Sequence, residues 1–169
     1  MKIDDALKIF AERHSTRSFQ SKPVPRETLE IIVDAGRLAA TARNEQPWEF
    51  VVVTEAGRRR QIADTTEYGK FIAQAPACIA VFCRQTKYYL EDGSAATQNI
   101  LVAAAALGVQ SCWVAGDKKV YTADISRMLN VTDGYNLVSL IALGYESSPA
   151  PRVPKRKLEE VLHWEKFAR

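Results

Sequence analysis

Histidine is scarce in this sequence, and the residue patterns that usually mark a catalytic centre are missing. Only His14 and His163 occur among 169 residues, and neither lies in a motif with a nucleophile. The patterns GxSxG and HExxH are absent, and the three cysteines, Cys78, Cys83 and Cys112, show neither CxxC nor Cys/His metal spacing. We therefore expect no metal site and no catalytic side chain, and we expect any chemistry to be supplied by a cofactor.

Strong charge bias and long apolar runs are also missing. The 23 Lys and Arg residues against 20 Asp and Glu give a net charge of +3, which is too small to indicate a nucleic-acid partner. The longest apolar run is far below the length of a membrane span, and the N-terminus lacks the core of a signal peptide. Each cysteine lies in an apolar run, which favours a reduced interior. We expect a soluble, cytoplasmic protein with no nucleic-acid and no membrane partner.

The length and composition fit one domain spanning residues 1–169. Hydrophobic residues make up 47% of the chain, and no repeat, low-complexity segment or convincing linker divides it. Neither GxGxxG nor GxxxxGK[ST] is present, so neither a Rossmann dinucleotide site nor a P-loop is supported. Apolar periodicity predicts helices at 3–10, 26–40, 55–64, 91–107 and 123–130, and strands at 48–54, 77–83, 110–116 and 136–145. The first strand contains the apolar run FVVV and the second is the apolar run ACIAVFC, which predicts that both are buried.

The helix expected at 91–107 is rich in alanine. It becomes apolar on every side after Asn99 and ends at Gly108, a favoured C-terminal cap. A helix without a polar face must be covered all round, and its alanines permit close approach to another backbone. That backbone lies either within the fold or across a subunit interface.

The stretch RHSTR follows the first expected helix and has the residue types of a phosphate site. Arg13 and Arg17 are four residues apart, with the hydroxyls of Ser15 and Thr16 between them. Arginine binds phosphate through a bidentate fork of charge-assisted hydrogen bonds. The alternative is a solvated helix end whose positive charges favour the helix dipole.

A second basic cluster lies in the Pro-rich C-terminal tail and consists of Arg152, Lys155, Arg156 and Lys157. By itself it is typical of a solvated charge run. It gains meaning if the fold brings it to Arg13 and Arg17, which sequence spacing does not show.

The stretch RNEQPW, residues 43–48, precedes the first expected strand. Asn44 and Gln46 each offer a hydrogen-bond donor and an acceptor, and Pro47 fixes the entry to the strand. Such a pair suits a heterocycle that carries alternating C=O and N–H groups. The alternative is an ordinary turn that leads through a proline into an edge strand.

Taken in order, the segments of the chain resemble the nitroreductase family of FMN-dependent oxidoreductases. The resemblance rests on RHSTRSF, AATARNEQPWEFVVV, YYLEDGSAATQNILVAAAALGVQSCWVAG, LIALGY and PKRKLEEVLHW, which cover nearly the entire sequence. It implies an α+β fold in which a mainly antiparallel central sheet is flanked by helices on both faces. It also implies an intertwined homodimer with FMN sites at the subunit interface, in which the helix at 91–107 serves both the core and that interface.

The resemblance also implies which residues hold the phosphate end of FMN. The family's R-x-S-x-R motif grips the phosphate and the ribityl chain, and it maps to Arg13, Ser15 and Arg17. His14 is expected to contribute through its backbone. The basic residues before LEEV complete the phosphate site and map to Lys155 and Arg156 in this sequence.

The flavin ring is implied to meet two further segments. The family's Asn-x-Gln-Pro-Trp segment lies along the ring and maps to Asn44 and Gln46, and the segment before it, Thr41, Ala42 and Arg43, reaches the flavin of the partner subunit. Ala115 and Gly116 match the place where backbone N–H groups approach the ring.

The implied chemistry takes place on the flavin, in keeping with the missing catalytic side chains. NADH or NADPH gives a hydride and leaves, and an electron-poor small-molecule acceptor, such as a nitroaromatic or a quinone, then takes its place in a ping-pong order. One alternative is an FMN enzyme of the same scaffold that performs reductive dehalogenation, dehydrogenation or flavin breakdown. Another is a non-enzymatic module whose two basic clusters bind a phosphorylated partner.

Two departures from the family pattern concern the flavin and its surroundings. Thr41 stands where many members have serine, and Ala40 precedes it in place of proline. Between Asp64 and Pro76 the chain lacks the long helical insertion that larger members place over the substrate. We therefore expect a more open site.

Overall fold

A computed structural model describes residues 3–149 and 153–168 of the chain. Arg152, one member of the C-terminal basic cluster, lies outside the described residues. Across the described part, four strands form one antiparallel sheet in the order β1-β2-β4-β3. The strands are β1 (Trp48–Val53), β2 (Ala77–Arg84), β3 (Gln110–Ala115) and β4 (Tyr135–Gly144). The predicted antiparallel sheet is therefore confirmed.

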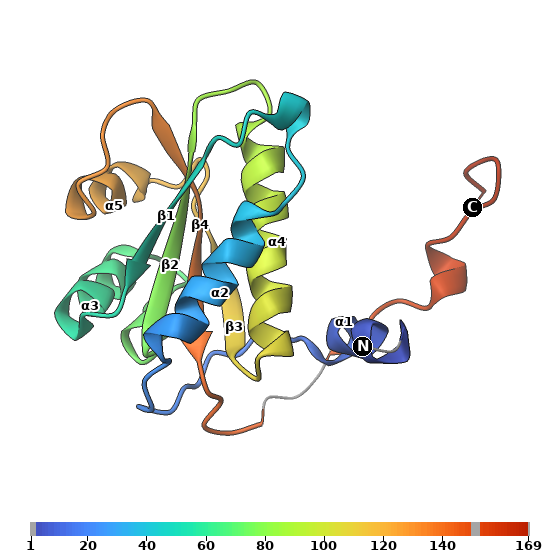
Figure 1. The fold of residues 1–169 in the computed structure, drawn as a ribbon, viewed down its shortest axis with the longest axis horizontal. Coiled ribbons are helices and arrows are strands. Elements are labelled where there is room, and N and C mark those ends of the chain that lie inside the picture. Colours follow the sequence, from blue (N-terminus) through green and yellow to red (C-terminus); the bar gives the residue numbers. More distant parts are fainter. Residues whose placement is uncertain (1–2, 150–152, 169) are drawn as a thin grey trace.

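Helices cover both faces of this sheet, as predicted (Figure 1). On one face lie α2 (Arg26–Arg37) and α4 (Tyr89–Ala106), and on the other lie α3 (Ala56–Thr65) and α5 (Thr122–Met128). The first helix, α1 (Ile3–Glu12), lies beside this body, and three short 3-10 turns, η1 (Ala42–Asn44), η2 (Lys70–Ala73) and η3 (Leu158–Glu160), complete the elements. Only α3, a loop and η2 separate β1 from β2, which agrees with the expected lack of a long helical insertion.

Two sequence predictions need correction. The strand expected at 48–54 was predicted to be buried, yet β1 is an edge strand that pairs with β2 alone, and Val52 is 40% exposed. An apolar run such as FVVV fits either position, because period-2 burial is hidden when both faces are apolar. The second helix ends at Arg37 rather than near residue 40, and it is followed by a turn at Leu38.

The alanine-rich helix α4 packs against both the sheet and α2. Ala96, Ile100 and Ala104 are buried in the cluster that these elements share, and Nδ2 of Asn99 donates to the carbonyl of Ala35 in α2 at 3.0 Å. Ala106, the last residue of the helix, is exposed, so the complete burial that the sequence predicted is not reached within one chain.

Close packing of α4 on the sheet depends on Gly93. A Cβ atom at this position would lie 2.7 Å from Cγ2 of Val138 and 2.9 Å from Sγ of Cys83. We expect Gly93→Ala to lower the free energy of unfolding by about 1–3 kcal/mol through overpacking. Urea unfolding followed by circular dichroism would measure this, with the half-buried Ser94→Ala as a matched control in the same turn. Equal stability of the two variants would show that α4 shifts without penalty.

The C-terminal tail, residues 153–168, extends away from the sheet and its helices (Figure 1). It carries many exposed apolar side chains, namely Val153, Leu158, Val161, Leu162, Trp164 and Phe167. Because apolar surface is favourably removed from water, a tail of this composition is suited to docking against another surface.

Candidate functional site

The segment after α1 runs beside the free edge of β3. Ser15 forms a parallel bridge with Ser111, and the backbone N–H of Thr16 donates to the carbonyl of Ser111 at 3.0 Å. Backbone pairing with a sheet therefore fixes the position of RHSTR, although the sequence suggested only a polar loop.

The side chain of His14 is engaged within the fold. Its Nε2 lies 3.2 Å from Oε1 of Glu146, and its Nδ1 lies 3.0 Å from the carbonyl oxygen of Glu12. The hydroxyl of Thr16 donates to the same Glu146 oxygen at 3.2 Å. Because both ring nitrogens have these partners, the side chain of His14 is engaged within the fold, and a backbone contribution of His14 to a ligand stays a prediction.

Arg13, Ser15 and Arg17 gather around the buried thiol of Cys112. Burial raises the pKa of that thiol, and the guanidinium of Arg17, a hydrogen bond with Ser15 and the guanidinium of Arg13 act in the opposite direction. The guanidinium of Arg17 also lies 6.0 Å from the centre of the Phe71 ring. The three predicted phosphate ligands are thus brought together at one place, where positive charge and a hydroxyl meet.

The other end of β3 carries Ala115 and Gly116. The N–H of Gly116 donates to the carbonyl of Val138 at 3.0 Å, so it is not available to a ligand. Hydrogen-bonding direction alternates along an antiparallel edge strand, which turns the N–H of Ala115 toward the free edge. The sequence predicted backbone donors at both residues. In the structure the N–H of Gly116 is used within the sheet, so the Ala115 N–H is left as the candidate donor.

Gly116 is required for close packing. A Cβ atom there would lie 2.6 Å from Cγ of Leu137 and 2.9 Å from its carbonyl oxygen. The segment is also held by hydroxyl groups, since Tyr121 donates to the carbonyl of Ala115 and Thr122 donates to that of Gly116 at 2.7 Å. These contacts fix the orientation of the Ala115 peptide.

A third hydroxyl contact holds the same loop. The hydroxyl of Tyr89 donates to Oδ1 of Asp117 at 2.6 Å, and this hydrogen bond, with burial, raises the pKa of Tyr89 to about 12. The sequence analysis assigned no role to Tyr89, Tyr121 or Thr122. In the sequence, a Tyr-Thr pair follows the turn after Gly116, and this is only a weak indication that hydroxyl groups hold the loop.

Residues 41–47, which we call the carboxamide segment, have an unusual backbone. Arg43, Asn44 and Gln46 have φ values of 57°, 56° and 46°, in the left-handed region that non-glycine residues rarely adopt. Nε2 of Gln46 donates to Oδ1 of Asn44 at 3.2 Å, and both side chains are exposed. The hydroxyl of Thr41 accepts a hydrogen bond from the N–H of Gln46 at 3.3 Å. The two carboxamides therefore form one exposed pair with a donor and an acceptor left over.

The predicted site residues fall into two groups within one chain. The carboxamide segment and the Ala115–Gly116 segment are both attached near the first turns of α4, through the Ala42 N–H and Asp117 respectively. Arg13 to Arg17 lie at the start of β3, which follows the other end of α4. The rise of β3 from Ser111 to Ala115 separates the two groups by about 14 Å along this edge of the sheet.

The basic residues of the tail do not join either group within the chain. Arg156 lies 3.3 Å from Glu160 through Nε and Oε2, and Lys155 is exposed on the tail that leaves the body (Figure 1). Lys155 and Arg156 are therefore not brought to Arg13 and Arg17 by the fold of one chain.

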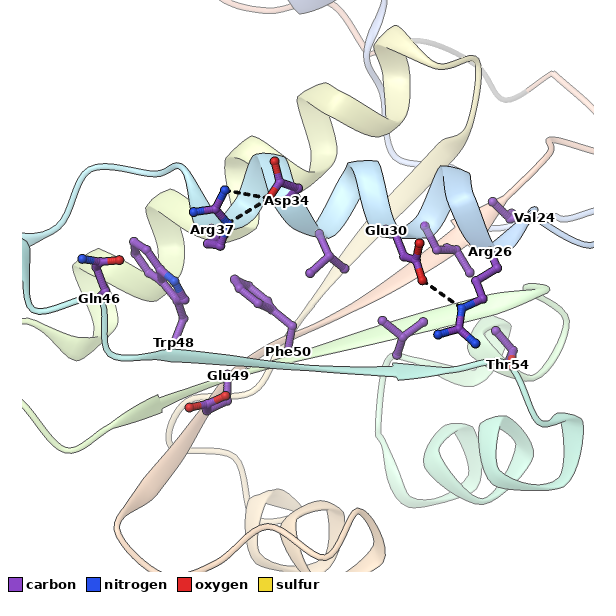
Figure 2. A pocket seen from close by; sticks show the side chains of 13 residues that line it. Val24, Arg26, Glu30, Asp34, Arg37, Gln46, Trp48, Glu49, Phe50 and Thr54 are labelled. Atoms are coloured by element: carbon purple, nitrogen blue, oxygen red, sulfur yellow. Dashed lines mark hydrogen bonds and ion pairs between the residues drawn. The ribbon is translucent and has the colours of Figure 1, made fainter.

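A groove of about 900 Å³ lies between α2 and the free edge of β1 (Figure 2). Trp48 and Phe50 of the strand point into it and face Leu29 and Val33 of the helix, and Gln46 lies at one end. Its charged rim includes two ion pairs at 2.8 Å, Arg26 with Glu30 and Arg37 with Asp34.

The chain was compared with known proteins. The model of a family described as "Nitroreductase family" matches residues 10–77 and 61–145. A candidate NADH dehydrogenase/NAD(P)H nitroreductase from Archaeoglobus fulgidus is 31% identical over 154 residues, covering 85% of this chain and 86% of that protein.

Solved structures share the fold. A crystal structure named as a candidate NADH dehydrogenase/NAD(P)H nitroreductase from Bacteroides thetaiotaomicron has a TM-score of 0.91 at 27% identity, covering 96% of this chain and 98% of that one. An FMN-dependent nitroreductase from Clostridium difficile has a TM-score of 0.88 at 24% identity, covering 95% and 99%. Within the residues that the structure describes, each helix is too short or too polar to cross a membrane.

Proposed function

Because this chain belongs to the nitroreductase family, a family of oxidoreductases, we propose that it is an FMN-dependent enzyme that uses NADH or NADPH to reduce electron-poor acceptors. The acceptors would be nitroaromatics, quinones or similar small molecules. One observation carries the proposal: the free edge of β3 has an arginine-rich anion site at one end and a free backbone donor at the other. We further propose that residues 1–169 act as one domain.

The residues at the first end suit a phosphate. Arg13 and Arg17 supply two guanidinium groups and Ser15 a hydroxyl, and within the described residues neither guanidinium has a carboxylate within 4.0 Å. Guanidinium forks match phosphate oxygens bidentately. These three side chains would hold the phosphate of FMN.

The residues at the second end suit the ring. From Ser111 to Ala115 the strand rises by about 14 Å, which separates the anion site from the Ala115 N–H along one edge. That N–H would donate to the acceptor atoms of the ring, and it is held in place by the Tyr121 contact to the same residue's carbonyl. Asn44 and Gln46 offer the matching carboxamide pair, supplied by the same chain or by a partner chain.

Bound FMN would supply the redox chemistry, a hydride transfer from a reduced nicotinamide followed by reduction of an acceptor. The residues of this chain would bind and orient the donor and the acceptor against the ring, and the Ala115 N–H would stabilise negative charge on the ring. We further propose that donor and acceptor use the same space beside the ring in turn, with ping-pong kinetics.

We also propose that the enzyme is a homodimer in which each tail lies in the partner's groove. The groove borders β1, whose outer backbone groups are unpaired, and its walls are apolar. The tail offers the exposed side chains of Leu158, Val161 and Leu162, which would bury apolar surface against these walls. A free edge strand beside an apolar groove is a favourable place for an added segment of chain.

Visible spectroscopy tests the proposed cofactor and the donor together. We expect the purified protein to be yellow, to lose its flavin absorption within the mixing time when NADPH or NADH is added without oxygen, and to recover it when a quinone is added. Colourless protein that takes up no added FMN would contradict the cofactor assignment. Flavin that is bound but reduced only sluggishly by both nicotinamides would favour another reaction on the same scaffold.

A further inference from the structure

The carboxamide segment is held in a conformation that it would not adopt by itself. Three of its non-glycine residues, Arg43, Asn44 and Gln46, have left-handed backbones. Left-handed backbones of this kind are unfavourable and persist only when surrounding contacts impose them. Strain of this type is frequent at functional sites, so the contacts that impose it are of interest.

Several contacts hold the segment, and a buried carboxylate supplies one of them. Nη2 of Arg84 donates to the carbonyl of Glu45 at 3.1 Å, and the backbone N–H of Arg84 donates to the carbonyl of Pro47 at 2.9 Å. At the other end, the N–H of Ala42 donates to Oδ1 of Asp92, in the first turn of α4, at 2.9 Å. Asp92 therefore links the start of the segment to the core.

Asp92 is an unusual residue at this place. It is only 4% exposed, and within the described part of the chain its Oδ2 has no hydrogen-bond partner and its carboxylate forms no ion pair. Burying a carboxylate with an unpaired oxygen opposes folding. A favourable charge at the helix N-terminus does not explain the burial, because the exposed neighbour Glu91 already supplies one.

We propose that Asp92 is a positioning residue that keeps residues 43–46 in the left-handed conformation and so presents the Asn44–Gln46 carboxamide pair. Its negative charge strengthens the bond to the Ala42 N–H beyond what a neutral acceptor gives. In the proposed function, FMN is the ligand that hydrogen-bonds to the Asn44–Gln46 pair. The positioning role rests on that function only in the measurement of flavin binding. The conformation itself can be tested without any ligand.

Local opening of the segment is the first measurement. We expect Asp92→Ala to raise the hydrogen-exchange rate of the Ala42 amide, and the rate of tryptic cleavage after the exposed Arg43, by about 10- to 100-fold, the worth of one charge-assisted hydrogen bond. Asp92→Asn keeps the shape and a neutral acceptor but loses the charge, so it should restore only part of the protection. Glu91→Gln removes the neighbouring exposed charge of the same turn and should leave both rates unchanged.

Flavin binding is the second measurement. We expect Asp92→Ala to bind FMN more weakly than the wild type and Asp92→Asn to recover part of the affinity. The Glu91→Gln control should keep the global stability of the wild type. Unchanged exchange and cleavage rates in Asp92→Ala would overturn the positioning role, whatever the flavin does. If the variant unfolds globally, Asp92→Asn decides alone: protection equal to that of the wild type at Ala42 would show that the charge is not needed. Faster local opening in a protein that binds no FMN would support the positioning role and count against the proposed function instead.

Discussion

Replacing Arg17 by alanine is expected to raise the dissociation constant for FMN by about 10- to 150-fold, because the change removes a charge-assisted, bidentate contact to phosphate. The guanidinium lies beside Ser15, Arg13 and the Cys112 thiol at the start of β3, and it is the charged group that most strongly affects that thiol. Fluorescence titration of the apoprotein with FMN would measure the change.

Two further variants make this result specific. Arg17→Lys keeps the charge but loses the fork, so we expect an intermediate affinity. Arg60→Ala removes an exposed arginine of α3 and should bind FMN as the wild type does. An Arg17→Ala protein with unchanged affinity would remove this residue from the phosphate site.

Deleting residues 153–169 is expected to convert a dimer into a monomer and to weaken self-association by a factor on the order of 10³ or more. That factor corresponds to the loss of only two or three buried aliphatic side chains of the tail. Sedimentation or light scattering across a range of concentrations would measure it. A truncated protein that remained dimeric at nanomolar concentration would show that the tails do not hold the subunits together.

The proposed docking of the tail rests on its apolar side chains, whereas the family resemblance assigns Lys155 and Arg156 to the FMN phosphate, and two variants test these two assignments separately. Replacing Leu158, Val161 and Leu162 by serine in the full chain removes apolar surface and keeps the basic residues, so dimerisation should fail. Replacing Lys155 and Arg156 by alanine keeps the apolar surface, so the dimer should persist while FMN binds more weakly. The opposite pattern would contradict the assignment of apolar docking and phosphate contacts to these residues.

Much of the fold could be predicted from the sequence because its signals are local. Pro47 and Gly108 mark the entry to β1 and the end of α4, and uninterrupted apolar residues mark β2 and β4. The edge position of β1 could not be predicted in this way, because it depends on which strand pairs with which, and the run FVVV reads the same at an edge and at the centre.

The residue types of the candidate site could be predicted from the sequence, but the hydrogen bonds that hold these residues in place could not. Arg13, Ser15 and Arg17 were identified as an anion site, and the structure brings them together. The hydroxyl of Tyr121 contacts the Ala115 carbonyl only once the intervening turn has formed. Hydrophobic periodicity in the sequence does not predict such a contact. The role of Asp92 could not be predicted, because its bond to Ala42 depends on a segment 50 residues away.

The placement of the tryptophans gives each region of the protein its own optical reporter. Trp48 points into the groove, Trp164 lies exposed on the tail, and the half-exposed Trp113 belongs to β3, beside the edge proposed for the flavin. Docking of a tail would move Trp164 from water to an apolar wall and shift its emission to the blue. A bound flavin would instead quench Trp113 by energy transfer. With single-tryptophan variants, the order in which subunits associate and cofactor binds can be followed in real time without any added label.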